Sequence, residues 1–219
     1  NQDIIKGFSL KEMLTYVLFG SLVHIIIKNF VSDRVSEEIK DGKLSLFLIK
    51  PISYLGYTFA LSIGQFFFVT ILSVITHLVI ILFFIDKFIL NFETVYFSVI
   101  LVMIILAFVI EFLIAYLVGL IAFWTDETTG IYATISRLKK FFSGGYFPIN
   151  LLPALFVSIS LYFPFAYSFF VPSQLYLKKI SINDGIKGLA IQLIWIILLY
   201  FIIRFVWKKG IKRYEGIGI

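Results

Sequence analysis

Long apolar runs separated by short polar stretches are the dominant pattern of this chain. A helix needs roughly 20 apolar residues to cross the hydrocarbon core of a bilayer. Runs of that order predict spans at about residues 9–31, 54–84, 95–123 and 188–207. The second and third runs are long enough to tilt or to extend past the membrane. The pattern therefore predicts an all-α integral membrane protein.

The stretch between residues 124 and 187 is less regular. A polar turn at 124–130 precedes a helical segment that we interpret as a further span at 131–146. Proline, which removes an amide donor and disrupts a helix interior, then recurs at short intervals, at Pro148, Pro153, Pro164 and Pro172. The apolar pieces between these prolines, none longer than 10 residues, are too short to cross a bilayer. We therefore expect residues 147–172 to form a re-entrant outer hairpin.

The distribution of Lys and Arg indicates the orientation, because cytoplasmic loops carry an excess of both. The loop 32–53 and the C-terminal tail are richer in basic residues than the loops on the other side. We expect one transmembrane domain, residues 1–219, multi-pass in the cell membrane, with its C-terminus in the cytoplasm. Five spans that end inside place Asn1 outside. Since no signal peptide is visible, we expect a sixth, N-terminal span upstream of Asn1.

Composition excludes several classes of protein. Hydrophobic residues make up 60% of the 219 residues and charged residues only 15%, against about 25% charge in soluble domains, so most of the surface must face membrane lipid. The net charge of +6 does not indicate nucleic acid, because the basic residues gather at the ends of apolar runs. Cysteine is absent, which excludes disulfides and thiolate sites. His24 and His77 are isolated in apolar runs, and we interpret them as packed, neutral residues.

The most informative polar segment follows the first span. Val31, Val35 and Ile39 recur every four residues, so a helix over 32–42 has one apolar stripe and one charged face. Gly42 is placed to end this helix. Two interpretations fit an amphipathic helix lying on the inner membrane face. It docks a cytosolic partner, or it is an ordinary juxtamembrane helix in the headgroups.

A series of short motifs runs in order along nearly the whole chain. Gly42-Lys43-Leu44 leads to Leu48-Ile49-Lys50-Pro51 between two spans, a G-x-L … L-x-x-P pattern. The series continues with Phe142-Ser143-Gly144-Gly145-Tyr146-Phe147-Pro148, the proline-rich segment, Trp195, and a basic tail that contains Trp207, Gly216 and Gly218. In order and spacing this series resembles the permease (transmembrane) subunits of type 2 ABC exporters, the ABC-2 family.

The resemblance implies a type 2 ABC exporter permease fold with a partner that supplies energy. Residues 32–42 would be the coupling helix seated on a cytosolic ABC ATPase subunit, and residues 147–172 the outer gate. A second permease subunit, identical or related, would complete the pathway. ATP and Mg²⁺ would sit on the ATPase, with no cofactor and no metal bound by this chain. The chain has no G-x-x-x-x-G-K-[ST] phosphate loop, so we expect that the permease itself is not an enzyme.

The resemblance also assigns candidate residues to the two regions. The candidates for ATPase coupling are Arg34, Glu37, Glu38, Lys43 and Phe47. The candidates for the outer gate are Phe147, Pro148, Pro153, Pro164 and Phe165.

Charged residues also occur inside predicted spans. Glu111 lies in the third, and Arg137, Lys139 and Lys140 lie in the fourth. An ionised side chain at the bilayer centre costs at least about 2.5–3.5 kcal/mol, so such groups face protein or water. At about 1.5 Å per residue from the turn between the two helices, Glu111 and Lys140 are at similar heights, roughly 18 and 15 Å.

Three interpretations of these charges remain open. Glu111 pairs with Lys140 or with Arg137. Alternatively, the surplus positive charge lines a translocation path and attracts an anionic or zwitterionic cargo. In the third interpretation the basic residues reach water because the span ends earlier than predicted.

We therefore expect the transmembrane permease subunit of an ATP-binding-cassette exporter, which moves an amphipathic or lipid-like substrate outward while a partner hydrolyses ATP. The alternative is a secondary transporter or channel that uses Glu111 as an ion relay. An intramembrane enzyme is disfavoured, because the sequence contains no paired acids, no Ser/His arrangement and no metal cluster.

Overall fold

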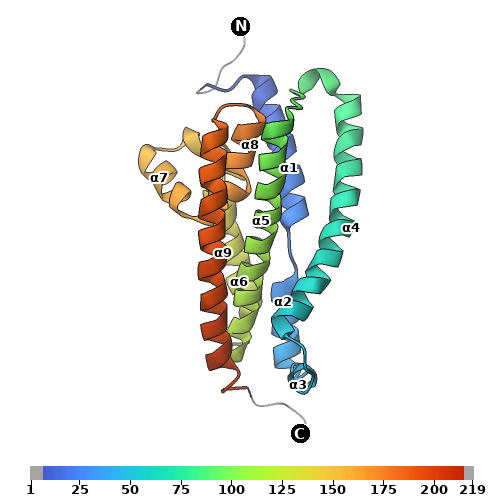
Figure 1. Cartoon of the computed structure of the whole chain (residues 1–219), viewed down its shortest axis with the longest axis vertical. Helices are drawn as coiled ribbons and strands as arrows, with labels where there is room; N and C mark the ends of the chain where they lie inside the picture. Colours follow the sequence, from blue (N-terminus) through green and yellow to red (C-terminus); the bar gives the residue numbers. More distant parts are fainter. Residues whose placement is uncertain (1–6, 215–219) are drawn as a thin grey trace.

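The structure, a computed structural model, describes residues 7–214, and every secondary-structure element in that range is a helix. The expectations for Asn1, Gly216 and Gly218 lie outside the described residues. Long helices run side by side along an elongated bundle, with α5 (Thr94–Gly119) at its centre (Figure 1). Met103, Ala107 and Ile110 on α5 are fully buried. The core of the protein therefore lies around α5.

Within the described residues, four helical segments are long and apolar enough to cross a membrane. They are α1 (Leu10–Ile27) with α2 (Val31–Lys40), α4 (Tyr54–Phe83), α5 with the short helix η2 (Leu120–Phe123), and α9 (Ile182–Gly210). These segments overlap the spans predicted near 9–31, 54–84, 95–123 and 188–207, and the first of them continues through α2 to Lys40. The lipid-facing character is also visible, because α4 and α9 leave most of their apolar side chains exposed.

The further span predicted at 131–146 is a shorter helix. It is α6 (Thr128–Phe142), whose 15 residues extend about 22 Å, less than the roughly 30 Å hydrocarbon core. The chain turns after α6 at Gly144, which has a φ of +81°, a conformation that glycine adopts without steric cost. The Tyr16 hydroxyl donates a hydrogen bond to the Gly144 carbonyl at 2.8 Å. Four of the described helical segments are thus long enough to span a bilayer, and α6 is not among them.

The proline-rich segment is broken into short helices, as its prolines predict. These are η3 (Ile149–Leu151), α7 (Ala154–Tyr162), η4 (Pro164–Ser168) and α8 (Phe170–Tyr176). In Figure 1, α7 projects from the side of the bundle while α8 lies within it. The remaining short helices, α3 (Ser45–Leu48) and η1 (Ile85–Lys87), lie at opposite ends of α4.

Side chains of neighbouring helices satisfy carbonyl groups of the broken segment. The Gln192 amide, fully buried on α9, donates to the Tyr167 carbonyl at 3.2 Å and to the Met103 carbonyl at 3.1 Å. The indole of Trp195 donates to the Tyr162 carbonyl at 3.1 Å. Irregular backbone at membrane depth requires such partners inside the protein.

Candidate functional site

The amphipathic helix predicted at 32–42 is α2, and its apolar stripe faces the protein. Val31, Val35 and Ile39 are buried. Asp41 is the C-terminal cap and Gly42 follows with a φ of +74°, the left-handed conformation expected of a glycine that ends a helix. We expected this helix to lie flat on the inner membrane face, across the end of the bundle. Instead it continues below α1, along the long axis of the bundle (Figure 1).

Close packing holds α2 against α5 and α6. A Cβ atom at Gly119, near the end of α5, would lie 2.7 Å from Val35 Cβ and 3.0 Å from the Ser32 carbonyl oxygen. The hydroxyl groups of Ser36 and Thr128 are 2.6 Å apart. Displacement of α2 would therefore be felt by both α5 and α6.

The candidate coupling residues divide into exposed and packed groups. Arg34 and Glu37 are exposed on α2. Lys43 is exposed and lies 2.7 Å from the Asp41 carboxylate, whose hydrogen bond raises the pKa of Lys43 above its ordinary value. Glu38 accepts a hydrogen bond of 2.6 Å from the Tyr54 hydroxyl.

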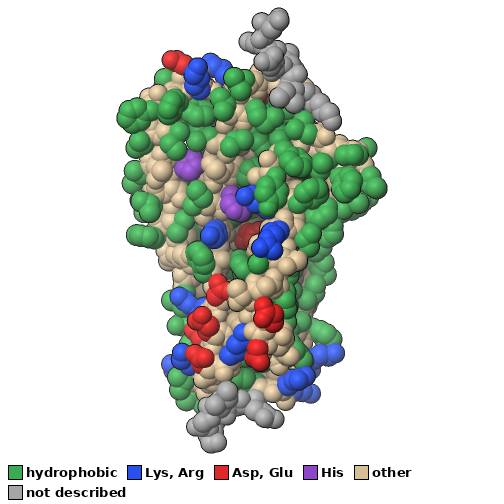
Figure 2. Space-filling model, turned by 180° about the vertical axis from the view of Figure 1, so that it is seen from behind, with side chains coloured by type: hydrophobic (Ala, Val, Ile, Leu, Met, Phe, Trp, Pro, Cys, Tyr) green, Lys and Arg blue, Asp and Glu red, His purple; other side chains and the backbone are tan. Residues whose placement is uncertain are grey.

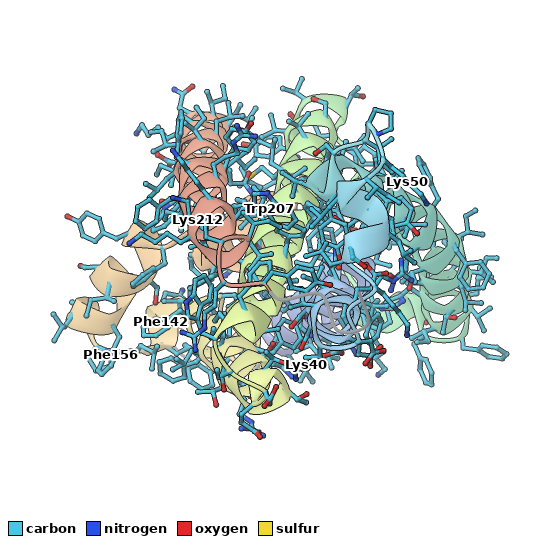
Figure 3. All side chains as sticks on the ribbon, turned by 90° about the horizontal axis from the view of Figure 1, so that it is seen from below. Lys40, Lys50, Phe142, Phe156, Trp207 and Lys212 are labelled. Carbon is cyan, nitrogen blue, oxygen red and sulfur yellow. The ribbon has the colours of Figure 1, made fainter. Side chains whose placement is uncertain are left out.

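Phe47 is also a packing residue. Its ring centre lies 5.2 Å from that of Tyr54 and 4.7 Å from that of Tyr57. Figure 3 shows this end of the molecule from below, with Lys40 and Lys50 labelled. The free charged face of α2 consists of Asp33, Arg34 and Glu37.

A buried ion pair joins α5 to α6. The Lys139 ammonium donates to the Glu111 carboxylate, and their side chains are 9% and 13% exposed. The predicted pairing of Glu111 with Lys140 or Arg137 is therefore wrong in its partner, although the two helices do meet at this height. Successive helical residues differ by about 100° in direction, so Lys139 reaches Glu111 whereas the Lys140 ammonium lies over the Tyr146 ring. Arg137 is exposed.

The ion pair forms part of a charged pocket of about 120 Å³, which brings together side chains of α1, α5, α6 and η4. The polar residues that line it are His24, Lys28, Glu111, Tyr132, Ser136, Lys139, Lys140, Ser143 and Ser168. Figure 2, which views the molecule from behind relative to Figure 1, shows charged and histidine side chains gathered about midway along its length. Three lysines and one glutamate leave the pocket with a surplus of two positive charges.

Two of the pocket lysines have no carboxylate partner among residues 7–214. The Lys28 ammonium lies 4.8 Å from the centre of the Phe30 ring, and the Lys140 ammonium lies 4.7 Å from that of Tyr146. Nothing in the sequence indicated that Lys28, near the end of the span predicted at 9–31, belongs to this pocket. Arg137, which we expected in the path, is not among the residues that line the pocket.

The two histidines differ from each other. His77 is buried and packed as expected, with Nε2 at 2.9 Å from the Ser21 hydroxyl and Nδ1 at 2.8 Å from the Ser73 carbonyl. The expectation that His24 is packed is wrong, because His24 is exposed and lines the charged pocket. Within residues 7–214 no group of three or more His, Cys, Asp and Glu side chains is placed to hold a metal ion.

The candidate gate residues differ in their exposure. Pro148 and Pro164 are buried, whereas Phe147 and Pro153 are exposed. Phe165 stacks on Phe163 at 5.7 Å between ring centres, and it also lines the charged pocket. The proline-rich segment therefore reaches the charged pocket through η4.

A scan against protein families matches the family described as ABC-2 family transporter protein over residues 1–218. Comparisons with curated proteins and with solved structures gave no match. The matched range includes α2, the charged pocket and the proline-rich segment. The family match and the apolar helices together indicate a multi-pass membrane protein. The chain belongs to the ABC-2 family of transporters and is a transmembrane permease component without an ATPase site of its own.

Proposed function

We propose that this chain is the permease subunit of an ABC exporter, driven by a cytosolic ABC ATPase that docks on the charged face of α2. One observation carries the proposal. The apolar stripe of α2 is packed tightly against Gly119, while Asp33, Arg34 and Glu37 remain exposed at the end of the bundle. A rigidly seated helix with a free charged face is suited to receive a force and to pass it on.

The contacts of α2 lead toward the charged pocket. Glu111 lies eight residues from Gly119, about 12 Å along α5. Lys139 lies eleven residues from Thr128, about 16 Å along α6. ATP and Mg²⁺ would bind to the partner, and closure of the partner subunits would press on α2. The two helices that carry the ion pair would then move relative to each other.

The charged pocket supports an amphipathic cargo with an anionic or zwitterionic group. An unpaired lysine in hydrocarbon costs at least about 2.5–3.5 kcal/mol, and a phosphate or carboxylate beside Lys28 and Lys140 would remove that cost. The pocket volume of about 120 Å³ is below the roughly 300 Å³ of the smallest pockets for drug-sized ligands. Only the charged group would enter, and the apolar remainder would stay outside.

The remaining parts of the proposal concern topology. The loop with α2 and the C-terminus face the cytoplasm of the cell, and residues 147–172 form a re-entrant hairpin that gates the outer mouth through Phe165. A second permease subunit, identical or related, completes the path. The alternative role for Glu111, an ion relay in a secondary transporter or channel, is disfavoured because Lys139 already neutralises this carboxylate.

Co-purification from native membranes tests the proposal. The variants Arg34→Glu and Glu37→Lys reverse exposed charges on α2 and should lower recovery of the ATPase at least about tenfold, because like charges across an interface cost several kcal/mol. Asp86→Lys, an exposed residue at the other end of the bundle, is the matched control and should leave recovery unchanged. Equal recovery with all three variants, or no ATPase with the unmodified chain, would contradict the proposal.

A further inference from the structure

A large apolar groove lies between α4 and α9, with α5 as its floor. Its volume is about 860 Å³. The floor consists of Val109, Phe112, Leu113 and Tyr116, whereas Glu111 on the same helix faces the charged pocket. The groove and the charged pocket are therefore separate sites on different faces of α5.

The groove exists because the two helices that flank it do not pack closely on each other. α4 packs mainly on α1, and α9 packs mainly on α5. Aromatic rings bridge the two walls at one end, where the Tyr54 and Trp207 ring centres are 5.6 Å apart. Figure 3 views this end of the molecule and shows Trp207 on the α9 side and Lys50 on the α3 side.

Charge in the groove is confined to one end. Of the residues that line it, only Lys50 and Arg204 are charged, and neither Asp nor Glu is present. Both cations are exposed. Arg204 lies one turn from Trp207, and the lining of α9 continues for eight more residues to Ile196, about 12 Å further along the helix. The groove is thus cationic at one end and apolar along its length.

We infer that this groove holds an anionic phospholipid of the bilayer, with its phosphate between Lys50 and Arg204 and its acyl chains along α5. The shape and charge match a molecule with one anionic end and a long apolar remainder, and Trp and Tyr beside the cations are typical of a headgroup interface. Anionic lipid headgroups are also drawn to clustered basic side chains next to a membrane. The placement in the cytoplasmic leaflet rests on the orientation in the proposed function.

The bound lipid would connect the coupling region to α9. Phe47 and Leu48 of α3, which follows α2 in the chain, line the same groove as Tyr200 and Phe201 of α9. A lipid in the groove would therefore fill the space between α4 and α9, on a different face of α5 from a cargo in the charged pocket.

Native mass spectrometry of the purified permease complex tests the inference, with phosphatidylglycerol and phosphatidylcholine as probes. The double variant Lys50→Gln/Arg204→Gln should retain phosphatidylglycerol roughly 10- to 30-fold less than the unmodified chain, because each basic residue adds to the attraction. Lys208→Gln/Lys209→Gln, exposed residues at the end of α9 outside the groove, is the matched control. Ile197→Trp, at an exposed lining residue, should narrow the groove and reduce retention of both lipids.

Several results would overturn the inference. Equal retention of phosphatidylglycerol and phosphatidylcholine by the unmodified chain would overturn it. An equal loss of phosphatidylglycerol in the Lys50/Arg204 variant and in its Lys208/Lys209 control would also overturn it. The chain contains no cysteine, so Ile197→Cys introduces a single thiol. A disulfide between two copies of this variant in the membrane would assign the groove to a subunit interface instead. Lipid retention requires neither ATP nor cargo, so its failure leaves the co-purification result standing.

Discussion

Removal of the Glu111–Lys139 ion pair should affect stability in a strongly non-additive way. The two side chains are almost completely buried. Two unit charges about 4 Å apart attract each other by about 4 kcal/mol at an effective dielectric constant of 20. Removal of one partner from a buried pair leaves an uncompensated charge and typically costs about 3–5 kcal/mol, whereas apolar replacement of both is often neutral or stabilising.

The perturbations are Glu111→Met, Lys139→Met and the double variant, measured by thermal unfolding in one detergent. Each single variant should unfold about 10 °C lower, since 1 kcal/mol shifts the midpoint by about 2–4 °C in a chain of this size. The double variant should recover most of that loss. Lys140→Met is the matched control, because the Lys140 ammonium lies over the Tyr146 ring and not at Glu111.

Two outcomes would refute the reasoning. If the losses of the two single variants add in the double variant, the residues do not form a coupled pair. The double variant Glu111→Met/Lys140→Met is compared with Glu111→Met/Lys139→Met. If the first recovers stability and the second does not, the pairing assigned to α6 is wrong by one residue.

Three further predictions follow from single contacts. Gly119→Ala should displace α2 from α5, since a Cβ atom there would overlap Val35, and should reduce ATPase-coupled transport at least about tenfold. Gly64→Ala, where a Cβ atom would meet no other group within 4 Å, should leave transport unchanged in the same assay. Gln192→Leu should destabilise the protein by about 1–3 kcal/mol because the Tyr167 and Met103 carbonyl groups each lose a buried donor. An unchanged unfolding midpoint would show that these hydrogen bonds are unimportant. Lys140→Gln should weaken export of an anionic amphiphile several-fold more than export of a cationic one, measured in proteoliposomes that also contain the ATPase. Arg137→Gln, outside the pocket, is the control and should change the export of either amphiphile little.

Much of the fold could be predicted because lipid imposes a simple rule on sequence. Long apolar runs mark α4, and α5 with η2, to within about one residue, since charged groups are excluded from hydrocarbon. The helix α9 begins at Ile182, six residues before the predicted span. The stripe of Val31, Val35 and Ile39 identified both the helix α2 and its buried face, and Gly42 identified its end. These are local properties that depend on periodicity alone.

The site could be predicted only in part, because its geometry depends on which way each helix faces. Residue counting placed Glu111 at the height of the basic residues of α6. Counting did not give the direction in which each side chain points around its helix, and that direction determines that Lys139 is the partner. The end of α6 was also placed too late, because the aromatic residues around Gly144 extend the apolar run beyond the turn. The groove between α4 and α9 arises from tertiary packing and has no signature in the sequence.

Site-specific labelling at Glu37 and Asp86 tests the central claim that the charged face of α2 receives a cytosolic ATPase. Because the chain lacks cysteine, Glu37→Cys and Asp86→Cys each carry one thiol at an exposed position. In intact cells a membrane-impermeant maleimide should label the thiol at 86 and not the thiol at 37, and a cross-linker at 37 should capture an ATP-binding subunit. Labelling of the thiol at 37 from outside the cell, with no ATPase captured there, would contradict the account.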